Sequence, residues 1–291
     1  MNTLYFSPTG TTRKVVQAFA KGFGGGLNEN DITLPQARRN QLNPRLVRTG
    51  GPAPEPLDDP GSIFSLLTVF AGPVYGGRSF KLLTSAIAKL QGEGRPAVCI
   101  VNYGGRHYDM ALADLYEAAT KAGFIVVACG AFIGEHSFSR NIQTGRPNAD
   151  DLQTARNFGR QVREMLAEMV TSGAPLPAMA AADVPQRPVD LDAIGMHRER
   201  LGRLTPNRPS PDLNVCLHCG ACASVCPLGL INMNDSDDIK PGCLKCNTCV
   251  KTCPVGAMRF PQEDFIVVAR NCEETFGKEV RQPEVWLAGR S

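Results

Sequence analysis

The chain has 291 residues, enough for about two domains of ordinary size. Hydrophobic residues make up 43% and charged residues 20%, which is typical of folded domains and excludes a largely disordered or fibrous chain. The net charge is only +3, so we expect no nucleic-acid binding. The longest apolar runs fall far short of the ~20 residues that cross a bilayer, and no secretory signal is visible. We therefore expect a cytoplasmic protein with no membrane span.

Residues 1–170 alternate strand-like and helix-like segments, a pattern typical of a parallel sheet with helices on both faces. The predicted strands are 2–6, 31–34, 64–71, 96–102 and 124–129. The predicted helices are 12–21, 109–122 and 149–169, the last beginning at Asn148 with Asp151 three residues later. Residues 35–61 have no periodic pattern and are predicted to form an irregular insertion.

The rest of the chain changes character twice. Residues 171–211 are rich in Ala, Pro and Gly and are predicted to be a linker, with a short helix around 191–201. Residues 212–263 hold most of the cysteines and form a second domain. Residues 264–291 are predicted to be a C-terminal tail with a strand-like segment at 265–269 and the only tryptophan, Trp286.

Eight of the eleven cysteines lie in two copies of one motif. Cys216-x-x-Cys219-x-x-Cys222-x-x-x-Cys226-Pro recurs 27 residues later as Cys243-x-x-Cys246-x-x-Cys249-x-x-x-Cys253-Pro. Disulfides would require an oxidising compartment, so clustered cysteines here point to metal. Cys99 and Cys129 lie in apolar strands and are predicted to be small core residues, and Cys272 has no partner at ligand spacing.

Short spacers let three thiolates wrap one face of an iron–sulfur cube, while the fourth cysteine, followed by proline, reaches the other cluster. We therefore assign one [4Fe–4S] cluster to Cys216, Cys219, Cys222 and Cys253. The second cluster is assigned to Cys243, Cys246, Cys249 and Cys226. The alternative is structural zinc, but zinc ribbons separate two cysteine pairs by a longer spacer.

A hydroxyl-rich turn follows the first predicted strand and opens a helix. Its candidate binding residues are Ser7, Thr9, Gly10, Thr11 and Thr12. Free backbone N–H groups and the helix dipole at such a position suit a phosphate. Neither G-x-G-x-x-G nor G-K-[ST] is present, which disfavours dinucleotides and nucleoside triphosphates. Ordinary helix capping is the alternative explanation.

Two glycine-rich loops are predicted beyond the carboxyl ends of the third and fourth strands, where ligands of such sheets bind. The first offers Pro73, Val74, Tyr75, Gly76 and Gly77. The second offers Asn102, Tyr103, Gly104, Gly105, Arg106 and Tyr108. Each loop taken singly could be a simple turn with core aromatics, but three loops at one edge favour a binding site.

The turn at 7–12 resembles the T-x-T-G-x-T loop that holds the FMN phosphate in flavodoxins, with serine for the first threonine. Together with residues 134–137 and both cysteine motifs, the chain resembles the flavodoxin–ferredoxin fusion proteins of anaerobes. The resemblance implies an α/β fold: a flavodoxin-like, five-stranded doubly wound parallel sheet that binds FMN, then a small α+β two-cluster ferredoxin domain. It departs from many flavodoxins in having no tryptophan near the predicted flavin loops. Arg78, Arg106 and His107 could stabilise an anionic reduced flavin.

The predicted function is electron transfer between the two clusters and FMN, with a redox protein of ferredoxin, hydrogenase or reductase type as partner. Two alternatives stay open at this stage. One is an FMN-dependent reductase of a small molecule, and the other is an electron-bridging subunit of a larger complex. Glu135 and His136 are candidates for catalytic proton handling, although structural contacts would account for them equally well.

Overall fold

A computed structural model describes residues 1–39, 60–188 and 207–289. Most of the predicted irregular insertion and the whole predicted helix at 191–201 lie outside the described residues. None of the helices in the described ranges combines the length and apolarity that crossing a membrane requires.

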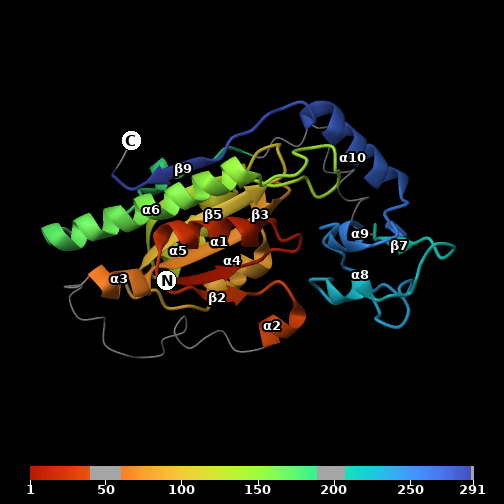
Figure 1. Cartoon of the computed structure of the whole chain (residues 1–291), viewed down its shortest axis with the longest axis horizontal. Helices are drawn as coiled ribbons and strands as arrows, with labels where there is room; N and C mark the ends of the chain where they lie inside the picture. Colours follow the sequence, from red (N-terminus) through yellow and green to blue (C-terminus); the bar gives the residue numbers. More distant parts are fainter. Residues whose placement is uncertain (40–59, 189–206, 290–291) are drawn as a thin grey trace.

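The N-terminal domain is built on a parallel sheet (Figure 1). Its parallel strands are β1 (Asn2–Tyr5), β2 (Asn28–Asp31), β3 (Thr68–Tyr75), β5 (Pro96–Tyr103) and β6 (Ile125–Ile133). They run in the order β2-β1-β3-β5-β6. This is the 2-1-3-4-5 order of the flavodoxin-like doubly wound fold, so the predicted fold class is confirmed. A short strand, β4 (Arg78–Ser79), folds back on β3.

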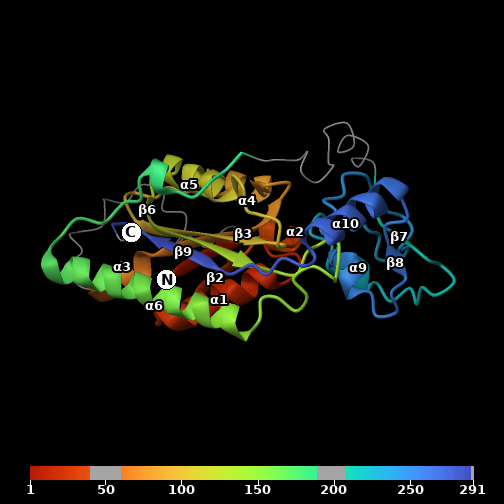
Figure 2. The ribbon, with the colours of Figure 1, turned by 90° about the horizontal axis from the view of Figure 1, so that it is seen from above.

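Helices cover both faces of the sheet (Figure 2). One face carries α1 (Thr11–Phe23), α3 (Pro60–Leu66) and α6 (Ala149–Ser172). The other carries α4 (Lys81–Ile87), which the sequence pattern did not reveal, and α5 (Ala111–Lys121). A further short helix, α2 (Pro35–Arg39), follows β2.

The packing of α1 on α6 follows from the apolar spacing along α1. Val15, Val16, Phe19 and Phe23 are fully buried and lie on one helical face. On α6, a Cβ added to Gly159 would lie 2.1 Å from the carbonyl oxygen of Phe19. The two backbones therefore approach too closely for any larger residue at that position.

The cysteine-rich region is small and irregular. Strand β7 (Ser210–Pro211) pairs antiparallel with β8 (Met258–Arg259). Two single-turn helices, α8 (Ala221–Ser224) and α9 (Thr248–Thr252), occupy corresponding places in the two motifs. A short 3-10 turn at Ala181–Asp183 precedes this region. Figures 1 and 2 place the region beyond one end of the sheet.

The C-terminal segment differs most from expectation. The predicted strand at 265–269 is wrong, because those residues lie inside helix α10 (Glu263–Phe276). Phe265, Val268, Cys272 and Phe276 are buried on one face of α10, a helical spacing that the local Ile-Val-Val run obscures. The chain then returns to the N-terminal domain as β9 (Glu284–Leu287), antiparallel to β6 at the sheet edge.

Two other predicted boundaries are corrected. The second strand is Asn28–Asp31 and not 31–34. The Ile32 N–H still donates to the Tyr5 carbonyl oxygen of β1, but the next N–H, of Thr33, donates to the Asp31 side chain at 2.8 Å, which turns the chain away from the sheet. Phe64 belongs to α3, and the third strand begins at Thr68. The run 64–71 is apolar throughout, and such a run does not distinguish a buried helix end from a strand.

Candidate functional site

The two cysteine motifs share one backbone path. His218 and Lys245, 27 residues apart, both have positive φ, at 49° and 57°. Two residues later, Gly220 and Asn247 repeat the pattern at 71° and 58°. Residues in the left-handed conformation between the cysteines bend each loop, so that its cysteines can face a common centre. The sequence repeat is therefore also a structural repeat.

Four cysteines drawn from both motifs line one hollow, which we call the inner cavity. They are Cys226, Cys243, Cys246 and Cys249. The empty space, including its mouth, measures about 390 Å³, and Phe260 adds to its apolar lining. Backbone N–H groups of Leu230 and Lys245 donate to the sulfurs of Cys226 and Cys243, each at 3.3 Å.

A second hollow, the outer cavity, is lined by the remaining four cysteines of the motifs. They are Cys216, Cys219, Cys222 and Cys253. Its empty space measures about 340 Å³, and Leu217, Ser236 and Val255 line it as well. The Ser236 hydroxyl lies 3.4 Å from the Cys216 sulfur. Cys219 is exposed to solvent.

Burial disfavours free thiolates at four of these cysteines. Burial raises the pKa of Cys222, Cys243, Cys246 and Cys249. Thiolates there need nearby positive charge, which metal ions supply. At Cys253 burial also acts to raise the pKa, but backbone N–H groups of residues 255–258 outweigh it and lower the pKa. In the described ranges no three His, Cys, Asp or Glu side chains lie close enough together to hold a single ion.

The inner cavity lies against the N-terminal domain. Leu244, one of its lining residues, packs on the hydrophobic core between the sheet and α4–α5. At the end of β3, burial and the adjacent negative charge of Cys246 raise the pKa of Tyr75. From α2, the Arg38 guanidinium donates to the carbonyl oxygen of Pro227 at 2.5 Å. One set of four cysteines is thus adjacent to the sheet, and the other faces away.

The three predicted binding loops meet at one edge of the sheet. The register pairs Tyr5 with Ala71 and Pro73 with Asn102, so the carboxyl ends of β1, β3 and β5 are level. The Met110 N–H donates to the Gly77 carbonyl oxygen at 3.0 Å and joins the two glycine-rich loops. The three loops that the sequence places at one edge of the sheet therefore do lie at that edge in the structure.

Buried polar atoms at this edge lack hydrogen-bond partners among the described residues. Thr12 Oγ1 is fully buried with no hydrogen-bond partner among the described residues. Both side-chain polar atoms of the buried Asn102 are likewise without a partner in the described part of the chain. Gly10, at φ 78°, precedes α1 and has no side chain with which to cap it, whereas the Ser7 hydroxyl accepts from the Arg13 N–H at 3.0 Å. Such groups are costly to bury unless a ligand completes them, and a phosphate suits the helix N-terminus.

The remaining predicted binding residues divide into two groups. Six of them belong to the turns and strand ends of this edge: Ser7, Thr9, Val74, Gly76, Gly104 and Gly105. Thr11 is the first residue of α1. Tyr103 and Tyr108 are instead 4% exposed and pack edge-to-face, with ring centroids 5.6 Å apart. Trp286 from β9 packs on Tyr108 with centroids 6.1 Å apart. These two tyrosines are core residues, which was the alternative explanation for this loop's aromatics.

The cations near the loops have carboxylate partners. Arg78 binds Asp114 through two hydrogen bonds of 2.9 and 2.6 Å. Arg106 pairs with the fully buried Asp109, which also accepts from Arg187 at 3.2 Å. Burial alone would raise the pKa of Asp109, but hydrogen bonds from His107, Arg106 and Arg187 lower it to about 2. Much of the positive charge expected near the predicted flavin site is therefore offset.

Glu135 and His136 lie at the junction of the two domains. Lys251 of α9 donates to Glu135 Oε1 at 2.7 Å and to the His136 carbonyl oxygen at 2.8 Å. His136 Nδ1 accepts from the Phe138 N–H at 3.1 Å. Burial, with the nearby charge of Lys251, lowers the pKa of His136 to about 4. These are structural contacts across the domain junction, and the proton-handling role stays a prediction.

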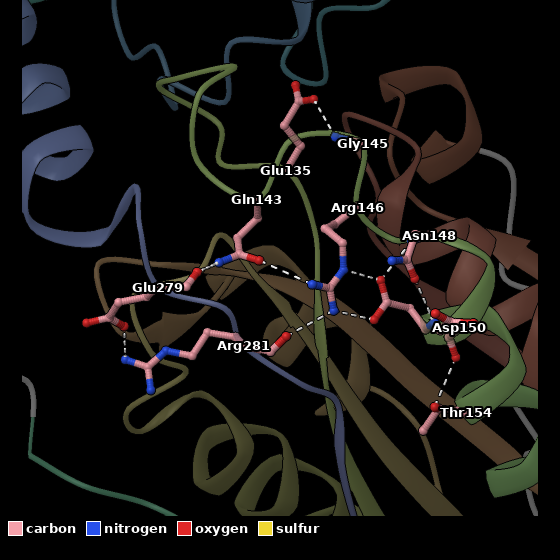
Figure 3. A network of polar contacts seen from close by, with 10 residues as sticks. Glu135, Gln143, Gly145, Arg146, Asn148, Asp150, Thr154, Glu279 and Arg281 are labelled. Atoms are coloured by element: carbon pink, nitrogen blue, oxygen red, sulfur yellow. Dashed lines mark hydrogen bonds and ion pairs between the residues drawn. The ribbon is translucent and has the colours of Figure 1, made fainter.

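A polar network links the loop after β6 to the segment that precedes β9 (Figure 3). Arg146 lies at its centre and binds Asp151 at the start of α6. It also donates to Gln143 Oε1 at 3.3 Å and to the Arg281 carbonyl oxygen at 3.1 Å. Asn148 and Asp151 cap α6 reciprocally, as predicted from their spacing. Lys251 could not be recognised from the sequence, because Glu135 and His136 lie far away along the chain. Arg146 has two partners nearby in the sequence, but its link to the Arg281 carbonyl oxygen is equally long-range.

A family model described as a 4Fe-4S binding domain matches residues 213–229 and 241–256, which contain both cysteine motifs. A search of curated proteins found no match to the chain. The family match supports cluster binding by the C-terminal region.

Solved structures similar to the chain include flavodiiron proteins and a flavodoxin. The metal-soaked flavodiiron core from Synechocystis sp. PCC6803 is 15% identical, with a TM-score of 0.38. Rubredoxin oxygen:oxidoreductase from Desulfovibrio gigas is 11% identical, with a TM-score of 0.38. Each match covers 57% of this chain and 36% of the other, so this chain spans about a third of their length. A short-chain flavodoxin associated with a bacterial microcompartment is 11% identical, with a TM-score of 0.38, over 57% of this chain and 97% of that one.

Proposed function

We propose that the protein transfers electrons between bound FMN and two [4Fe–4S] clusters, and so links one-electron and two-electron redox partners. One observation carries the proposal. A cavity lined by four cysteines lies against the carboxyl edge of a flavodoxin-like sheet, where Tyr75 is beside Cys246. An iron–sulfur site in that position needs no separate encounter to exchange electrons with a ligand at the edge.

Each cluster would be held by three cysteines of one motif and the fourth cysteine of the other. The inner cavity supplies Cys226, Cys243, Cys246 and Cys249, and the outer cavity supplies Cys216, Cys219, Cys222 and Cys253. The backbone N–H groups that donate to Cys226 and Cys243 favour a negatively charged cluster, because hydrogen bonds to sulfur stabilise the anion.

FMN would place its phosphate on the turn at 7–12 and its ring between the loops at 73–77 and 102–106. Thr12 Oγ1 and the backbone N–H groups at the start of α1 would donate to the phosphate, and the Asn102 amide would bond the ring edge. Bound FMN supplies one- and two-electron redox chemistry, whereas each cluster carries one electron. The chain's own residues hold these groups at fixed separations and exclude water.

Anaerobic purification with chemical analysis tests the proposal. We expect about eight irons, about eight sulfides and about one FMN per chain. A redox titration followed by EPR and visible absorption should then show electrons shared between the clusters and the flavin. Zinc in place of iron, or protein with no flavin after reconstitution, would contradict the proposal. Turnover of small acceptors by the isolated protein would identify a reductase instead.

Substitution of Thr12 tests the FMN site without an activity assay. We expect Thr12→Val to weaken FMN binding by about tenfold or more, because a hydrogen bond to a charged group is lost. The flavin-free variant should be slightly more stable than wild type, since an unsatisfied buried hydroxyl has been removed. Fluorescence titration of flavin-free protein measures the affinity. Equal FMN affinity in the variant would remove Thr12 from the site.

A further inference from the structure

Exposed apolar side chains are concentrated on one part of the molecule. Among the described residues, eight large hydrophobic side chains are exposed, and five of them lie in the segments that form the outer cavity. We call these five the apolar patch: Leu213, Val215, Leu217, Met233 and Val255. The most exposed of them is Leu217, at 64%. Exposed apolar side chains gathered in neighbouring loops are typical of an interaction site.

The patch surrounds the exposed end of the outer cysteine set. Leu217 and Val255 line the outer cavity together with the exposed Cys219. The Met233 sulfur lies 2.7 Å from the place where a Cβ on Gly220 would stand, one residue after Cys219. Leu213 and Val215 belong to the turn in which the Cys216 N–H donates to the Asp212 carbonyl oxygen. The inner cysteine set, by contrast, lies against the sheet.

We propose that the apolar patch binds a one-electron redox protein beside the outer cluster, and that external electrons enter or leave the protein through this cluster. This proposal rests on the proposed function. The exchange moves one electron between the partner's centre and the cluster held by Cys216, Cys219, Cys222 and Cys253. One centre is oxidised by one electron and the other is reduced by one. No bond forms or breaks, and no proton is transferred.

Charge beside the patch indicates the chemistry of the partner's surface. The loop that carries Met233 also carries Asp235, Asp237 and Asp238. The cations beside them are Lys240 and Arg208, which donates to the Ile239 carbonyl oxygen at 2.9 Å. Ser236, between the first two of these aspartates, contacts Cys216. Arg259 is already paired with Asp212 at 3.2 Å. The rim of the patch is therefore acidic, and a partner with an apolar contact face and a basic rim fits it.

Binding of cytochrome c, a small basic one-electron protein, tests the proposal. Oxidised holoprotein and ferric cytochrome c are mixed, so that affinity is measured by calorimetry without electron transfer. We expect Leu217→Glu and Met233→Glu each to raise Kd by about tenfold, because a charge is placed in the apolar contact. Asp235→Asn combined with Asp237→Asn should raise Kd by about threefold or more. Added salt should weaken wild-type binding.

The matched control is Val280→Glu, which introduces the same charge at a side chain that is 79% exposed and outside the patch. We expect its Kd to equal that of wild type. Iron and FMN are quantified in every variant, so a failure of cofactor binding is separated from a failure of docking. Equal Kd in all variants with full cofactor content would overturn the proposal. A concentration-dependent dimer abolished by Leu217→Glu would overturn it as well, because the patch would then bind a second copy of the chain.

Discussion

Cys226 and Cys253, each followed by proline, close the two cysteine motifs, and each lines the cavity of the opposite motif. Neither of them lines the cavity that the first three cysteines of its own motif line. In the proposed crossed arrangement the two clusters would be interdependent, because neither motif could complete a cluster without the other.

Paired substitutions test the crossed ligand sets. Cys226→Ser with Cys243→Ser removes two ligands of one cluster, so about four irons should remain per chain. Cys226→Ser with Cys216→Ser removes one ligand from each cluster, and both clusters should become labile. Iron analysis after anaerobic gel filtration gives the result. If each motif instead bound its own cluster, the two double variants would show the reverse pattern.

His136 makes stability depend on pH. Its pKa is lowered from an ordinary value of about 6.5 to about 4, so the unfolded chain takes up a proton that the folded protein excludes. Stability is therefore fully present above about pH 6.5 and falls as the pH drops towards 4, by at most about 3 kcal/mol.

Urea unfolding of the anaerobic holoprotein at about pH 7 and about pH 5.5 measures this effect, which should be about 1.2 kcal/mol over that interval. His136→Asn keeps an acceptor for the Phe138 N–H but does not titrate. Its loss of stability between the two pH values should be smaller than that of wild type. An equal loss in both proteins would assign the pH dependence to another group.

At the scale of elements, the return of the chain from α10 to β9 joins the two domains a second time. The network around Arg146 fastens this return to the loop after β6 (Figure 3). The Arg146 side chain is 11% exposed and that of its partner Asp151 is 1% exposed. Among the described residues, removal of the cation leaves a buried carboxylate that only the Asn148 N–H still satisfies.

We expect Arg146→Met to reduce the free energy of unfolding by about 3 kcal/mol, because an unpaired buried charge is strongly destabilising. The matched control is Arg160→Met, which removes an exposed pair with Glu164 on the same helix and should cost less than about 1 kcal/mol. Chemical denaturation of both variants gives the comparison. Similar losses in the two variants would show that the network contributes little.

At the scale of the whole molecule, the position of the inner cavity depends on contacts between domains. Lys251 holds the loop at 135–136, and Arg140 donates to the Lys251 carbonyl oxygen at 3.1 Å. The side chains of Lys251 and Glu135 are 15% and 21% exposed. Burial acts to raise the pKa of Glu135, but the hydrogen bond from Lys251 lowers it. The ion pair is thus partly buried and is worth more than a surface pair.

Lys251→Met should loosen the domain junction, because Glu135 loses its partner in a partly buried position. We expect amide hydrogen exchange in α9 and in residues 134–138 to rise by about tenfold, and electron exchange between clusters and flavin to slow. Lys121→Met breaks an exposed pair with Glu117 and serves as the control. Unchanged exchange at the junction would show that other contacts hold the domains together.

The sequence alone identified several features because their causes are local. The 27-residue repeat specifies both cysteine loops, since each positive-φ position recurs at the same offset. The helix cap formed by Asn148 and Asp151 could be predicted because its two partners are three residues apart. The alternation of strands and helices predicted the parallel sheet, and parallel strands bring the turn at 7–12 and both glycine-rich loops to one edge.

Only the tertiary structure decided which features of distant segments meet. Trp286 packs against Tyr108, and Lys251 donates a hydrogen bond to Glu135. Residues 265–269, predicted to be a strand, belong to helix α10. The tertiary structure also placed one cysteine set against the sheet and left the other beside exposed apolar side chains. The two motifs are almost equivalent as sequences. Their different surroundings come from long-range packing, which no local spacing encodes.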